Sequence, residues 1–313
     1  MRTGYLCFLL LPLLLQAQPL RMQQSVENNQ RIFRYQFQAL EQDIRLQFSL
    51  DPGRIQHNGN MVQTYVPHRM QQQLWRELQL QANQAGPYRL TPGPGGDWQN
   101  FTVHYAATAT LSQATMAETE QLQQKLQQFS QQFQQQYVER MGYQLLLLAD
   151  NRQLITVDHP AIIQQSLADM AGLAQTVVGQ LGAADQQQLI TGLLTWVQLI
   201  PEHPAEQRQY GGTFAPPLQV LRQHQGDSAS KTVLLATLLR SSIPNVQLAI
   251  LYLPERTLLA LAVPSGPDDL TVTLQGTVYL VVDPSATEPL PPGQLSKIQK
   301  VYVLNQFLAY RLL

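Results

Sequence analysis

The segment Gly226–Lys231 (GDSASK) has the residue types of a nucleophile site at the start of a helix. Leucines at helical spacing follow it as far as Arg240, so Ser228 lies where free backbone amides and the helix dipole favour negative charge. A serine hydroxyl becomes a nucleophile only when a neighbouring base removes its proton. Ser228 could therefore attack an acyl group if the fold supplies such a base.

Few side chains in the sequence are suited to be that base. All histidines precede Ser228 in the chain: His57, His68, His104, His159, His203 and His224. A loop could return His203 or His224 to the serine, but an exposed or structurally hydrogen-bonded histidine is the favoured interpretation of both. Lys231 lies on the same helix as Ser228 and would need a strongly lowered pKa to accept a proton. We therefore expect no catalytic residue in this chain.

Composition argues against several other classes of site. The chain has 313 residues, of which 44% are hydrophobic, a formal net charge of −1 and an isoelectric point near 6.6. This charge gives no basic field, so we expect no nucleic-acid partner. Histidines are scattered, acidic residues lack the spacing of a calcium loop, and the Gly-rich segment 91–98 lacks the Lys-Ser/Thr pair of a phosphate loop. We expect neither a metal nor another cofactor.

Residues 1–17 have the pattern of a secretory signal peptide. Arg2 gives a positive start, Leu6–Leu15 form an apolar run, and Ala17 completes a small-residue cleavage site. A run of about ten apolar residues is too short to span a bilayer, so we expect no transmembrane segment after cleavage. The only cysteine, Cys7, lies in this run, and the mature chain would form no disulfide. A disulfide-free exported protein of this size favours a periplasmic location.

The rest of the chain predicts an α+β fold. Alternating apolar residues predict two antiparallel strands, 32–37 and 44–50, joined by a turn near 39–42. Apolar residues at intervals of three and four within 115–141 predict a long, glutamine-rich amphipathic helix that ends at Gly142. Its apolar stripe is expected to pack on its own domain in preference to a partner or a coiled coil.

Shorter signals complete the outline of the fold. They predict turns at 51–53 and 57–60, a helix at 67–82, a loop at 91–98, a hairpin at 143–159, helices at 160–181 and 185–201, and strands at 246–253, 257–263 and 277–282. We therefore expect a signal peptide at 1–17, an antiparallel β-rich N-terminal region at 18–110, a helical region with a β-hairpin at 111–184, and a helix-plus-antiparallel-sheet domain at 185–313.

Four C-terminal segments carry a resemblance to a known family. They are WVQLIP at 196–201, PLQVLRQHQGDSASKTVLLATLLR at 217–240, RTLLALAVP at 256–264 and YLVVDPS at 279–285. In their order and spacing, the chain resembles the transglutaminase-like (papain-like cysteine protease fold) superfamily, in particular its exported bacterial members. In that family a cysteine opens the helix, a histidine begins the following strand, and an acidic residue orients the histidine. Here Ser228 stands at the cysteine position, Arg256 (or Thr257, if the register slips) at the histidine position, and Asp283 at the acidic position.

The resemblance implies a transglutaminase-like domain with degenerate catalytic positions. Arginine is permanently protonated and cannot act as a base, so we expect an Arg256–Asp283 ion pair in place of the lost acid–base couple. The site neighbours that the resemblance implies are Asp227, Lys231, Trp196 and His224.

Three hypotheses about function follow. The first is a catalytically inactive transglutaminase-like periplasmic protein that binds a peptide or protein partner, or acts as a scaffold. The second is an active serine-dependent hydrolase or acyltransferase that uses Ser228. The third is an envelope assembly component whose N-terminal and helical regions carry the function.

Overall fold

The computed structural model describes residues 21–28, 30–106, 112–147, 153–203, 213–243 and 245–313. The predicted signal peptide and Cys7 lie outside these residues. The predicted α+β fold is confirmed, with an antiparallel sheet at the N-terminus, a helical middle and a five-stranded antiparallel sheet at the C-terminus. In the part of the chain that the structure describes, no helix combines the length and the apolar character needed to cross a membrane.

The N-terminal sheet contains β1 (Arg21–Glu27), β2 (Gln30–Ala39) and β3 (Gln42–Leu50), in that order and all antiparallel. The two strands predicted from alternation are β2 and β3, and Leu40 and Glu41 form the tight turn between them with positive φ. The inward side chains of both strands belong to the main hydrophobic core. β1 is mostly polar and exposed, so alternation does not predict it.

Helices lie between this sheet and the C-terminal sheet. They are α4 (His159–Leu181), α5 (Gln186–Leu199), α7 (Pro217–Gln223) and α8 (Ser228–Ser242). Asp158 and Asp185 cap α4 and α5, since their side chains accept hydrogen bonds from the backbone of the first turns of these helices. α8 is the most enclosed of these helices, and all residues from Ser230 to Leu239 are buried.

A short helix, α1 (Pro52–Gly59), replaces the two turns predicted at 51–53 and 57–60. The Asp51 side chain accepts a hydrogen bond of 3.0 Å from the Arg54 N–H, and Pro52 occupies the first turn, where no N–H is needed. The turn prediction was therefore wrong, because Asp-Pro is also a strong signal for the beginning of a helix.

The C-terminal sheet has the strand order β10 (Thr271–Leu274), β11 (Thr277–Val282), β9 (Thr257–Leu261), β8 (Leu248–Tyr252) and β12 (Ala309–Leu312). All neighbouring strands are antiparallel. One face of its central strands joins the main core, and the other face forms a second core that includes Val303 of α9 (Lys297–Leu304). Burial on both faces explains why β8 and β9 are apolar throughout instead of alternating.

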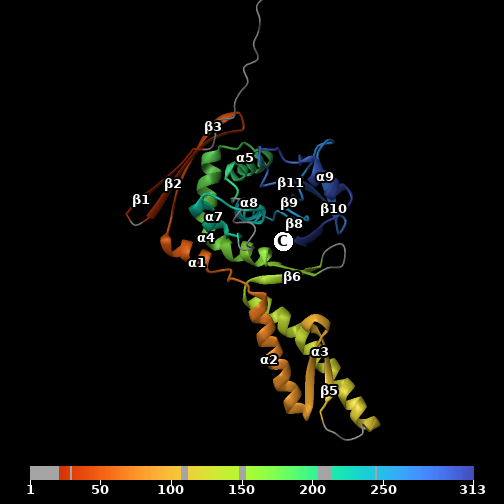
Figure 1. The fold of residues 1–313 in the computed structure, drawn as a ribbon. Coiled ribbons are helices and arrows are strands. Elements are labelled where there is room, and N and C mark those ends of the chain that lie inside the picture. Colours follow the sequence, from red (N-terminus) through yellow and green to blue (C-terminus); the bar gives the residue numbers. More distant parts are fainter. Residues whose placement is uncertain (1–20, 29, 107–111, 148–152, 204–212, 244) are drawn as a thin grey trace, which may run out of the picture.

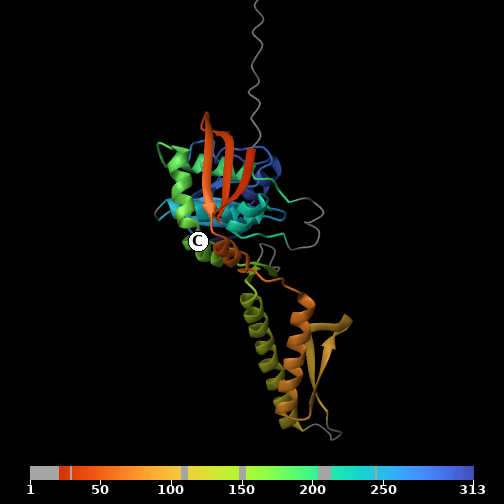
Figure 2. The ribbon, with the colours of Figure 1, turned by 90° about the vertical axis from the view of Figure 1, so that its left-hand side faces the viewer.

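An arm projects away from the body that the two sheets and their helices form (Figures 1 and 2). It consists of α2 (Pro67–Ala85), β4 (Tyr88–Gly93), a 3₁₀ turn (Pro94–Gly96), β5 (Asp97–Tyr105) and α3 (Gln113–Arg140). The stripe predicted on α3 packs against α2, β4 and β5 in a small core of the arm itself, as expected. The hairpin β6 (Tyr143–Leu147) and β7 (Gln153–Val157) lies at the base of the arm.

The two ends of the arm meet at the body. The Gln63 N–H donates a hydrogen bond of 3.1 Å to the Met141 carbonyl, so the chain enters and leaves the arm at adjacent points. Gly142 follows with φ +83°, and a Cβ there would lie 2.7 Å from the Met61 carbonyl oxygen. Both the backbone conformation and the close crossing require glycine at this position.

Candidate functional site

The candidate site is built at the N-terminus of α8. Asp227 caps the helix, since its Oδ1 accepts the Ser230 N–H at 2.7 Å and its Oδ2 accepts the Thr213 hydroxyl at 2.7 Å. Ser228 is the first helical residue, and its Oγ accepts a hydrogen bond of 3.1 Å from the Thr257 N–H at the beginning of β9. Among the described residues, Ser228 Oγ has no other hydrogen-bond partner, so the hydroxyl links the helix to the sheet.

The Lys231 ammonium bonds to the end of α5, and no hydrogen bond joins it to Ser228. Its side chain is 1% exposed, and Nζ donates to the carbonyl oxygens of Gln198 at 3.0 Å and Ile200 at 2.7 Å. These carbonyls lie at the C-terminal end of α5, where helical carbonyls lack partners within the helix. Burial lowers the pKa of Lys231 to about 8, and the carboxylates of Glu202 and Asp283 oppose this shift. The ammonium therefore joins α8 to α5.

Arg256 pairs with a different acid from the one that the sequence predicts. Its Nη1 lies 2.8 Å from Oε1 of Glu202, and it also donates to the carbonyl oxygen and the hydroxyl of Ser285, each at 2.9 Å. The predicted direct ion pair with Asp283 is therefore wrong. The Ser285 side chain stands between the two groups, because its hydroxyl donates to Asp283 Oδ1 at 2.8 Å.

Asp283 is a buried structural acid. It is 2% exposed, and it accepts hydrogen bonds from the N–H and hydroxyl of Ser285 and, at 2.7 Å, from Gln299 Nε2 of α9. Its backbone carbonyl accepts a further bond of 2.9 Å from Gln198 Nε2. A carboxylate that receives several donors in a dry environment is well stabilised and holds its neighbours in place. Here it connects β11, α9 and α5.

Trp196 and His224 lie together, on the side of the body that faces the N-terminal sheet. Trp196 is fully buried in α5 and packs edge-on against Tyr35, with ring centroids 5.4 Å apart. His224 lies in the left-handed turn that ends α7, and its ring is 5.5 Å from that of Tyr35. Burial lowers the pKa of His224. Neither side chain forms a hydrogen bond with Ser228. His203, the other histidine considered as a base for Ser228, is buried.

A cavity of about 350 Å³ opens beside the helix start, and we call it the α8 cleft. Asp227 and Ala229 of the α8 N-terminus, Thr257 of β9 and the segment around Phe214 line one side. The loop before the arm and the hairpin β6–β7 line the other. The cleft thus lies between the start of α8 and the base of the arm, and its wall mixes aromatic rings with hydroxyl and carboxyl groups, which suits a ligand that is partly apolar.

His159 also lines the α8 cleft, and no sequence signal connected it with Ser228. It is the first residue of α4, is 2% exposed, and its Nδ1 lies 3.0 Å from the Tyr252 hydroxyl. Burial lowers the pKa of His159 to about 4, although the Asp227 carboxylate opposes the shift. A neutral imidazole with so low a pKa is a poor general base near neutral pH.

The described residues offer no group of three or more His, Cys, Asp or Glu side chains that could hold a metal ion. Comparisons of the chain with protein-family models, with curated proteins and with solved structures find no match. The resemblance to transglutaminase-like proteins therefore stays a prediction that rests on the four C-terminal segments.

Proposed function

We propose that this protein is a catalytically inactive, transglutaminase-like protein of the periplasm that binds a peptide segment of a partner in the α8 cleft. The observation that carries the proposal is the state of the Ser228 hydroxyl, which accepts the Thr257 N–H and donates to no acceptor among the described residues. Without a base the hydroxyl stays a weak nucleophile.

Three polar groups near the start of α8 are held by contacts other than Ser228. Lys231 is enclosed and holds the end of α5, and Arg256 bonds to Glu202 and Ser285. The neutral ring of His159 is hydrogen bonded to Tyr252. These contacts favour a domain in which the helix and sheet of the proposed family are kept, while their polar groups hold secondary structure elements together.

A serine-reactive fluorophosphonate probe tests the absence of catalysis. We expect no labelling of the wild-type protein after incubation at neutral pH, because the hydroxyl has no partner to take its proton. Stoichiometric labelling that disappears in Ser228→Ala would contradict the proposal and favour the hydrolase or acyltransferase hypothesis.

A cleft-filling variant tests the binding function. Ala229→Phe places a ring in the α8 cleft, whereas Ala117→Phe makes the same change on the exposed surface of α3. We expect a library of random tetrapeptides to give saturation-transfer NMR signals with the wild type and Ala117→Phe, and weak signals with Ala229→Phe. Equal signals for all three proteins would refute peptide binding in the cleft.

The arm favours a second candidate function, in envelope assembly. It extends from the body with a core of its own (Figure 1). The half-buried rings of Phe129 and Phe133 line a groove between α2 and α3 beside arginine and glutamate side chains. Such a projecting element is suited to reach a partner. The N-terminal half of the chain cannot be separated from the C-terminal half to test this function, because the main core joins β2 and β3 to α8.

Excision of the arm is the appropriate test. Because the Gln63 N–H and the Met141 carbonyl are hydrogen bonded, a short Gly-Ser linker can replace residues 67–140 while the body keeps its core. If the arm carries the function, photo-cross-links formed in cells from Gln136 should identify a partner that no longer co-purifies with the arm-less protein. A partner retained by the arm-less protein would refute this candidate.

A further inference from the structure

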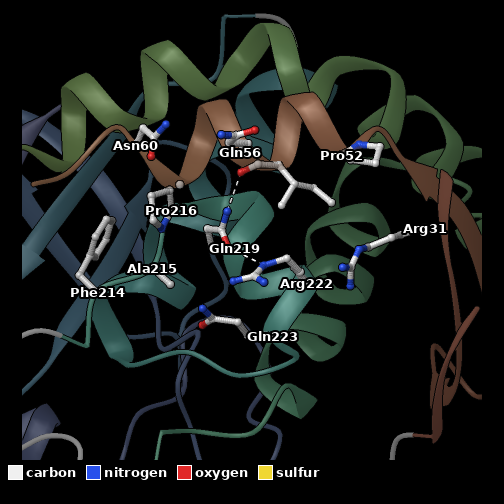
Figure 3. Close-up of a pocket in the computed structure, with 12 residues that line it drawn as sticks. Arg31, Pro52, Gln56, Asn60, Phe214, Ala215, Pro216, Gln219, Arg222 and Gln223 are labelled. Atoms are coloured by element: carbon white, nitrogen blue, oxygen red, sulfur yellow. Dashed lines mark hydrogen bonds between the residues drawn. The ribbon is translucent and has the colours of Figure 1, made fainter. Parts of the chain in front are cut away.

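A second cavity shares Gly59, Phe214 and Pro216 with the α8 cleft. It has a volume of about 520 Å³ and lies between α1, α7 and the beginning of β2 (Figure 3). We call it the arginine cavity, because Arg31 and Arg222 line it. Its other polar side chains are amides, those of Gln56, Asn60, Gln219 and Gln223, and no lining residue is acidic.

Arg222 is held in place with its terminal nitrogens unpaired. Its Nε donates to Gln219 Oε1 at 2.7 Å, and Gln219 Nε2 donates to the Ile55 carbonyl of α1, as the dashed lines in Figure 3 show. Gln219 is only 8% exposed, and Gly59 lets it approach, since a Cβ at Gly59 would lie 2.6 Å from its Nε2. Within the described residues, no acceptor pairs with the two terminal nitrogens of Arg222.

Arg31 adds a second cation without a counter-charge. It reaches from β2 toward α7 in Figure 3, and among the described residues its side chain forms neither an ion pair nor a hydrogen bond. Asp51 follows Leu50, the residue that pairs with Arg31 in the sheet, and its Oδ1 caps α1. Two guanidinium groups in one concave site, with no carboxylate among the lining residues, are the donor set that a planar oxyanion requires.

The geometry points to a binding site for a peptide carboxylate in the arginine cavity. Gly59, Phe214 and Pro216 line both this cavity and the α8 cleft, so one extended ligand can occupy the two sites across this shared wall. The amide side chains suit the peptide groups next to a carboxylate, because amides both donate and accept. The peptide nature of the ligand rests on the proposed function, whereas the preference for an oxyanion rests on the arginines.

NMR of the arginine Nε–Hε signals tests this site directly. The signals are assigned from Arg31→Gln and Arg222→Gln and are followed with three probes: random acetylated tetrapeptides with a free C-terminal carboxylate, the same library as carboxamides, and inorganic phosphate. We expect the carboxylate library to shift the Arg222 signal. The carboxamide library should bind roughly tenfold more weakly, because a charge-assisted pair is lost.

The double variant Arg31→Gln/Arg222→Gln should lose the preference for the free carboxylate. Arg54→Gln is the control, since it removes one positive charge from the exposed surface of α1, outside the cavity, and should keep the preference. Equal binding of both libraries, or a shift of the Arg222 signal by phosphate alone, would overturn the inference.

The backbone amide signal of Ala229 separates this inference from the function proposed for the α8 cleft. If the libraries shift Ala229 equally and leave Arg222 unchanged, the cleft binds peptide and the carboxylate site is refuted. If the carboxylate library shifts Arg222 and leaves Ala229 unchanged, the carboxylate site is supported and peptide binding in the cleft is refuted.

Discussion

The buried ammonium of Lys231 gives the protein an unusual dependence of stability on pH. Because burial lowers the pKa of Lys231 to about 8 from its ordinary value of 10.5, the folded protein releases this proton at lower pH than the unfolded chain does. Between these two values the unfolded state binds more protons, so the free energy of unfolding rises with pH. Below about pH 8 the protein carries the full cost of the buried charge.

The two pKa values set the size of the effect. Linkage gives a gain of about 2 kcal/mol in the free energy of unfolding between about pH 7.5 and pH 9.5. Solvent screening reduces this little, since the side chain is 1% exposed. The rise in the free energy of unfolding should end near pH 10. Burial raises the pKa of the Tyr35 and Tyr252 phenols, so at higher pH these phenols ionise more readily in the unfolded chain and the fold loses stability.

Urea denaturation followed by tryptophan fluorescence measures the change. Lys231→Met has a side chain of similar length that cannot ionise, so it should show a free energy of unfolding that lacks this rise. The quantity compared is the difference between the free energies of unfolding of the two proteins, in which the contributions of the other titrating groups cancel. Parallel pH profiles for the wild type and Lys231→Met would refute the conclusion that the lysine is charged and buried below pH 8.

Three further predictions concern Asp283, His159 and Ser228. Asp283→Ala should lower the free energy of unfolding by about 2–4 kcal/mol, because it leaves the donors of Ser285 and Gln299 unpaired, and an unchanged melting midpoint would contradict this. Burial lowers the pKa of His159 to about 4, so the stability that it contributes is present above pH 6.5 and lost as the pH falls toward 4. Acidification from about pH 7 to pH 5 should therefore cost the wild type about 2 kcal/mol more than His159→Gln in urea titrations. Ser228→Ala should cost only about 1 kcal/mol in the same assay, since one hydrogen bond to the Thr257 N–H is lost; a loss several times larger would show that the hydroxyl has other partners.

Local patterns were sufficient for most of the elements around the site. Alternating residues predict β2 and β3, and Asp227 before Ser228 predicts where α8 begins, because capping and side-chain periodicity are properties of neighbouring residues. β1 and β12 are edge strands without a clear pattern. β1 pairs with β2, the next strand along the chain, whereas β12 pairs with β8, which lies far away in the chain. The order of the five C-terminal strands likewise depends on contacts between distant segments.

The partners of the site residues were harder to predict. The sequence singles out Arg256 and Asp283. Arg256, however, forms its ion pair with Glu202, which lies far away in the chain, and Asp283 accepts a hydrogen bond from Gln299. His159 reaches the α8 cleft only because α4 packs along α8. Nothing in the spacing of these residues indicates such contacts, since each depends on how two separate elements meet.

By itself, the sequence determined most of the elements around the site, the start of α8 and the lack of a histidine after Ser228, because these depend on residue identity and order alone. Tertiary packing decided which charge meets which partner. It brought Lys231 onto the carbonyls of α5, separated Arg256 from Asp283 by a serine, and left Arg31 and Arg222 beside one cavity without an acid. Electrostatic pairing acts through distances and burial, and only the folded chain defines these.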